Sequence, residues 1–178
     1  MDARATDARV QIAAVMEDGA MGWLDKLLIA VWRGATPSSA EYFYEEMKRG
    51  IARHQRGLGH LAVIEPRTPL PPPEARQRIA SIFNEYPEST AAVSVVFEGT
   101  GFFAAAVGSV ATGIMFLSGR RTPFKVATNI GEAAIFLTRH IRVNDGHMSA
   151  RACIDAVEVL RRRLHGTPSI TPASMDRA

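Results

Sequence analysis

The residues with the clearest chemical pattern lie at 98–104, where a glycine turn joins a predicted strand to a predicted helix. The segment 99–104 (GTGFFA) matches the permissive form of the G-x-G-x-x-G/A fingerprint, whose glycines allow a backbone to approach a pyrophosphate. Glu98 precedes it at the carboxyl end of the strand, where open α/β sheets bind ligands. Glu98, Gly99, Thr100 and Gly101 are therefore the candidate ligand-binding residues.

The same turn also has a purely structural interpretation, which we favour. Phe102 and Phe103 place bulk where a pyrophosphate would have to approach, and the next predicted strand ends in Thr128-Asn129 rather than in an acidic residue. A tight strand-to-helix turn needs glycine for a positive φ in any case. In this interpretation Glu98 is an ordinary polar turn residue.

The other reactive residue types lack the spacing that catalysis or metal binding requires. The five histidines form no H-x-x-x-H pair with a third ligand, and Ser109 lies outside a G-x-S-x-G elbow. Cys153, the single cysteine, falls on an apolar helical stripe and is expected in the core. We expect no catalytic residue, metal or cofactor. An enzyme using the loop residues Glu65, Arg67 and Glu98 is the last-ranked alternative.

Composition indicates one globular domain without a nucleic-acid partner. The chain has 178 residues, is 47% apolar and carries a net charge of +3, and its acidic and basic residues are interspersed rather than sorted into a basic stripe. One cysteine excludes an internal disulfide framework, so a cytoplasmic location fits best. The longest uncharged run has an apolar core of residues 102–117 only, shorter than the roughly 20 residues of a membrane span. We expect a buried helix and no stable membrane insertion.

Hydrophobic periodicity then predicts an α/β domain over residues 10–164. We predict strands at 10–16, 26–32, 60–65, 91–97 and 124–128, with residues 17–22 as a hairpin connection between the first two. Helices are predicted to begin near Ser38, with Glu41 completing a capping box, and at residues 73, 102, 129 and 149. Residues 1–9 are expected to be flexible and residues 165–178 to form a disordered tail.

The predicted helix 102–117 is apolar on every side, which predicts burial of more than one face. Small residues at helical spacing permit a close approach, either to a second helix or to the helix's own sheet. In so small a domain, a partner subunit or the terminal helix must cover the second side. We therefore name as candidate interface residues of a homodimer Phe102, Phe103, Ala104, Gly108, Thr112 and Phe116.

The order of elements, a hairpin followed by alternating helices and strands over residues 10–141, resembles the STAS fold of anti-sigma-factor antagonists (the SpoIIAA-like family). The runs WRGATPSSA, PPPEAR and FEGTGFFAAA are similar to those of SpoIIAA-like bacterial proteins of unassigned function. The resemblance implies a mixed, mostly parallel sheet and a role in protein–protein contacts. The family's phosphorylated serine is missing: residues 65–71 read EPRTPLP, with Thr68 as the only hydroxyl.

These observations lead to two functional hypotheses. The first is a non-enzymatic, cytoplasmic STAS-like interaction module that associates with itself and with a signalling or scaffold protein. The alternative is a domain that binds a small ligand, a nucleotide or a lipid, through the turn at 98–104 or through a cavity lined by helix 102–117.

Overall fold

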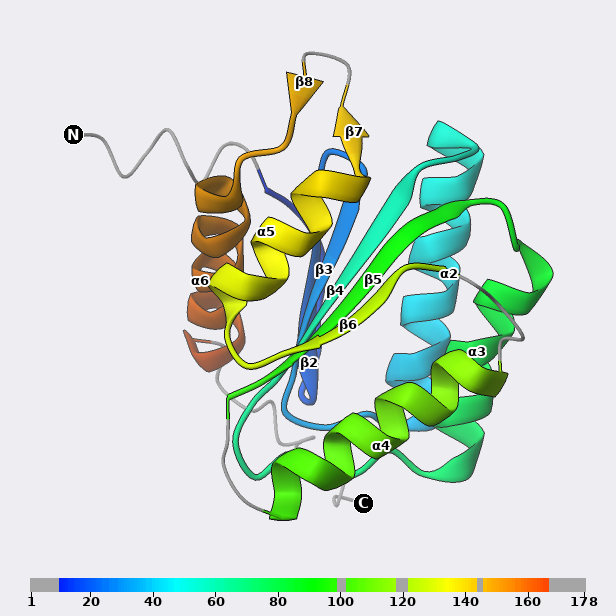
Figure 1. Cartoon of the computed structure of the whole chain (residues 1–178). Coiled ribbons are helices and arrows are strands. Elements are labelled where there is room, and N and C mark those ends of the chain that lie inside the picture. Colours follow the sequence, from blue (N-terminus) through cyan, green and yellow to red (C-terminus); the bar gives the residue numbers. More distant parts are fainter. Residues whose placement is uncertain (1–9, 99–101, 118–121, 144–145, 167–178) are drawn as a thin grey trace, which may run out of the picture.

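A computed structural model describes residues 10–98, 102–117, 122–143 and 146–166. A single six-stranded sheet separates two layers of helices (Figure 1). Its strands lie in sequence order: β1 (Gln11–Val15), β2 (Gly19–Leu24), β3 (Leu27–Trp32), β4 (Leu58–Ile64), β5 (Thr90–Phe97) and β6 (Phe124–Ala127). The first three strands pair antiparallel and the last four pair parallel. The predicted α/β class with a mixed, mostly parallel sheet is confirmed.

The helices divide between the two faces of the sheet. The crossover helices α2 (Pro37–His54), α3 (Pro73–Glu85) and α4 (Phe102–Leu117) pack on one face, through a core that includes Phe43, Phe83 and Ala111. On the other face lie α5 (Ile130–His140) and α6 (Ala150–Gly166), joined by the short strands β7 (Arg142–Val143) and β8 (Gly146–His147). Because both faces are covered, β3 and β4 are apolar on both sides.

The predicted hairpin connection at 17–22 is wrong, because most of it is the fully buried strand β2. Its sequence, GAMGWL, contains two glycines and no β-branched residue, so strand propensity gives no signal. Close packing explains the glycine at position 22. A Cβ on Gly22 would lie 2.9 Å from the Gln11 carbonyl oxygen and 3.2 Å from Cδ2 of Leu160. The sheet therefore opens with three antiparallel strands, and α6 can approach β2 closely.

The predicted cap of the first helix is also displaced. Thr36, not Ser38, is the N-cap of α2, and its hydroxyl accepts from the Ser39 amide at 3.2 Å while the Ser39 hydroxyl accepts from the Thr36 amide at 2.9 Å. Pro37 explains the shift, because proline fits the first helical position and keeps the residue before it extended. Glu41, the expected box partner, instead pairs with Arg78 of α3.

The bounds of α4 coincide with the predicted 102–117. The terminal helix does not cover its second side, since α6 lies on the opposite face of the sheet. Helix α6 continues to Gly166, two residues beyond the predicted domain end at residue 164. It buries the expected apolar stripe, which contains Cys153 and Leu160. Within the described residues, no helix combines the length and apolar character that crossing a bilayer would need.

Candidate functional site

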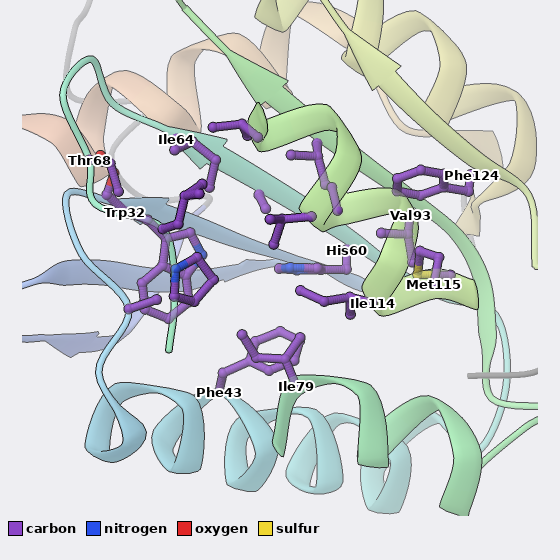
Figure 2. A pocket seen from close by; sticks show the side chains of 18 of the residues that line it. Trp32, Phe43, His60, Ile64, Thr68, Ile79, Val93, Ile114, Met115 and Phe124 are labelled. Carbon is purple, nitrogen blue, oxygen red and sulfur yellow. The ribbon is translucent and has the colours of Figure 1, made fainter. Parts of the chain in front are cut away.

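An apolar cavity of about 100 Å³ lies between α4, α3 and the sheet (Figure 2). Its floor comes from the buried residues Trp32, Ala62, Val93 and Val95 of three adjacent strands. One face of helix α4 forms the roof of the cavity. Helices α2 and α3 close one side of it. The lining of α4, α2 and α3 consists of Val107, Val110, Ala111, Ile114, Met115, Phe43, Ile79 and Phe83.

The cavity reaches the surface beside the loop that joins β4 to α3. Residues 68–71 of this loop contribute to the lining, and Leu70 at the rim is 44% exposed. Ile64 and Ile79 are half-buried at the same rim. The space therefore has a closed apolar end and an accessible mouth, which is the form of a site for part of a small molecule.

Small side chains explain why this space is unfilled. Ala35, Ala62 and Ala111 project into it from the chain after β3, from β4 and from α4. Close packing in a core requires side chains large enough to interdigitate, and these residues leave a gap between α4 and the sheet.

Thr68 fixes the loop at the mouth. Its hydroxyl is buried and donates to the carbonyl oxygens of Glu65, at 2.7 Å, and Trp32, at 3.1 Å. These bonds tie the loop to the ends of β3 and β4, and they use the only hydrogen that the hydroxyl can donate. Thr68 thus holds the rim of the cavity in place.

His60 is the only ionisable side chain among the residues that line the cavity. It lies on β4, is 5% exposed, and stacks at a tilt on Phe43 with 4.6 Å between ring centroids. Nδ1 lies 3.1 Å from the carbonyl oxygen of Leu28 on the neighbouring strand. Burial in these apolar surroundings lowers the pKa of His60 to about 4, so the imidazole is neutral at pH 7.

The candidate ligand residue Glu98 lies at a different place, at the carboxyl ends of β4 and β5. Its carboxylate pairs with Arg161 of α6, which also contacts Glu158 at 3.0 Å and lies 3.9 Å from Glu65. Nε2 of His165 lies 2.9 Å from the Glu65 carboxylate. Two of the three loop residues considered for an enzyme, Glu65 and Glu98, are therefore together, but both are engaged with α6.

The remaining predicted site residues are only partly placed. Gly99, Thr100 and Gly101 lie outside the described residues, as do the side chains of Phe102, Phe103 and Ala104. Of the other predicted interface residues, Gly108 is half-buried, whereas Thr112 is exposed and Phe116 is 84% exposed. Arg67 adopts a positive φ of 67° in the β4–α3 loop.

Sequence reasoning missed the role of His60, which it treated as one of several scattered histidines. A signal was present, because His60 is the only ionisable residue of a strand that is otherwise apolar, LGHLAVI. Among the described residues, no group of three His, Cys, Asp or Glu side chains could hold a metal ion. The chemistry that this geometry offers is apolar binding, with the imidazole of His60 and the indole N–H of Trp32 as hydrogen-bonding groups.

Comparison of the chain with protein-family models, with curated proteins and with solved structures found no match.

Proposed function

We propose that this chain is a non-enzymatic binding domain whose cavity under α4 holds the apolar end of a small molecule, such as a lipid chain or an aromatic ring. The observation that carries the proposal is the cavity itself, whose lining is apolar apart from His60, Thr68 and the indole N–H of Trp32. An apolar cavity of this kind stays dry and takes apolar guests; an engineered cavity of about 150 Å³ binds benzene.

The expected affinity follows from the size of the closed end. Burial of each CH₂ group contributes roughly 0.8 kcal/mol, so a group of about five carbons gains roughly 4 kcal/mol. That free energy corresponds to a dissociation constant of about 1 mM for a minimal probe. A natural ligand would gain further affinity from the part that extends through the mouth, past Leu70.

Toluene titration of the wild-type protein and two α4 variants tests this proposal. Ala111→Leu fills the cavity, because Ala111 is 8% exposed and lines it, whereas Thr112→Leu adds similar bulk on the exposed face of the same helix. We expect binding near 1 mM for the wild type and for Thr112→Leu, and at least tenfold weaker binding for Ala111→Leu, measured by NMR shift perturbation. Failure of toluene to bind the wild type, or equal binding by Ala111→Leu, would contradict the proposal.

Self-association remains a second proposal, and the exposed face of α4 favours it. This face consists of Ala105, Ser109, Thr112 and Phe116 and carries no charge. Phe116 is the one large apolar side chain of this face, and an exposed aromatic ring on an uncharged surface is typical of protein–protein contacts. Light scattering over a dilution series should give a dimer for the wild type and a monomer for Phe116→Glu. A wild type that is monomeric at 100 μM, roughly the upper range for specific weak dimers, would remove this proposal.

The likeness to the STAS family, the cytoplasmic location and a signalling or scaffold partner stay proposals that rest on the sequence patterns alone. The absence of catalytic activity is likewise our inference.

A further inference from the structure

Nε2, the second ring nitrogen of His60, has no hydrogen-bond partner among the described residues. The ring is held on one side by the Leu28 carbonyl oxygen, 3.1 Å from Nδ1, and on the other by the Phe43 ring. Among the described residues, no hydrogen bond reaches Nε2. Figure 2 shows His60 between the sheet and α4, in the midst of the apolar side chains that line the cavity.

The bond to Leu28 fixes the tautomer of the imidazole. A carbonyl oxygen can only accept, so Nδ1 carries the hydrogen and donates it. Nε2 of the neutral ring is then a bare acceptor with a lone pair. The cavity thus contains one directed acceptor, Nε2 of His60. The donors of its lining side chains are the indole N–H of Trp32 and the hydroxyl of Thr68, which is already engaged.

A water molecule is a poor partner for this nitrogen. Buried water needs two to four polar partners. The hydroxyl of Thr68 is already engaged, and Thr68 lies away from His60, on the far side of Trp32 in Figure 2. A water at Nε2 would have to leave most of its hydrogen bonds unmade among apolar side chains, which costs free energy.

We propose that the molecule held in the cavity donates one hydrogen bond, from a hydroxyl group, to Nε2 of His60, so that the site selects neutral alcohols or phenols. This inference rests on the proposed function. A hydrocarbon would leave Nε2 unpaired. A carboxylate would place a second acceptor against it, and an ammonium group would bury a charge with no counter-ion, since the lining contains no carboxylate.

Phenol and toluene provide the test, because they match in shape and differ by a hydroxyl in place of a methyl. We expect phenol to bind the wild-type protein about tenfold more tightly than toluene, after correction for their different hydration. His60→Phe keeps an aromatic ring on Phe43 and removes Nε2. In that variant the preference for phenol should disappear while the affinity for toluene stays within about twofold of wild type.

The ¹⁵N resonances of the His60 ring give an independent readout in the unmodified protein, which covers the case in which His60→Phe does not fold. Phenol should move the Nε2 signal towards that of a hydrogen-bonded acceptor and leave Nδ1 nearly unchanged, whereas toluene should move neither. Equal affinities for phenol and toluene, or an Nε2 signal that phenol does not shift, would overturn this inference and leave the binding function intact. Failure of both probes to bind would overturn both proposals.

Discussion

His60 sets the character of the cavity at the scale of single residues. A charged imidazolium at this position would be buried among apolar side chains with only the Leu28 carbonyl for compensation. The neutral form is therefore favoured, and burial lowers the pKa of His60 to about 4, from an ordinary value of 6.5. The unfolded chain binds a proton at this histidine between these two values, and the folded chain does not.

This difference predicts that stability falls as the pH is lowered. The contribution of neutral His60 is complete above pH 6.5 and is lost progressively towards pH 4, because protons stabilise only the unfolded state in that range. Urea unfolding should show a loss of about 2 kcal/mol between pH 7 and pH 5 from this residue. In His60→Phe the loss over the same range should be smaller by that amount. Equal losses in the two proteins would show that His60 does not titrate in this way.

Glu65 and Glu98, in contrast to His60, each have a partner of opposite charge. The carboxylates of Glu65 and Glu98 both lie beside Arg161, and Arg161 is only 18% exposed. This cluster joins α6 to the ends of β4 and β5. The place of Glu98 at a strand end makes it a candidate ligand residue from the sequence. The sequence contains no signal that an arginine 63 positions later would pair with the Glu98 carboxylate.

At the scale of elements, the start of α2 depends on Thr36. Its hydroxyl accepts from the Ser39 amide at 3.2 Å and donates to the Asp18 carboxylate at 3.0 Å, which also ties the helix to the β1–β2 turn. Thr36→Ala should reduce the free energy of unfolding by about 1 kcal/mol, measured by chemical denaturation. Ser38→Ala is the matched control, since Ser38 is exposed and not the cap, and it should have little effect. A larger loss for Ser38→Ala would support the cap expected from the sequence.

Substituting alanine for two helical glycines should change the stability of the protein in opposite directions. A Cβ on Gly50 of α2 would lie 2.7 Å from Cζ2 of Trp23, whose indole is held by a 3.1 Å hydrogen bond to buried Glu46. Gly50→Ala should therefore destabilise the protein by about 1–3 kcal/mol. A Cβ on Gly113 of α4 meets no described atom within 4 Å, so Gly113→Ala should stabilise it by about 0.5–1 kcal/mol. Thermal unfolding of both variants checks this pair, and a gain for Gly50→Ala would refute the close packing of α2 on β2.

The elements differ in how far the sequence could predict them. The bounds of α4 follow from a mostly apolar run without charge between segments that contain glycine, and the buried stripe of α6 follows from its period. Strand β2 could not be predicted in this way, because its glycines reflect contacts with β1, β3 and α6 that are distant in sequence. Local propensity reports backbone preference, whereas these contacts are tertiary.

At the scale of the whole molecule, the cavity is a consequence of the layered fold. Residues from β3, β4, β5, β6, the 65–72 loop and three helices meet there, drawn from positions 32 to 124 of the sequence. The sequence predicts both the sheet and the helix that bound it, and it allows a cavity under helix 102–117. It cannot predict which side chains would fail to fill the space, because that depends on how α4 sits over β5 and β6.

Intermolecular NOEs from bound toluene test most directly whether an apolar molecule enters this cavity. We predict NOEs from the toluene protons to methyl groups on both walls, Val95 of β5 and Ile114 of α4, and to the ring of His60. Contacts to these three residues would place the ligand between the sheet and the helix. NOEs confined to exposed Phe116, or none at saturating toluene, would contradict binding in the cavity.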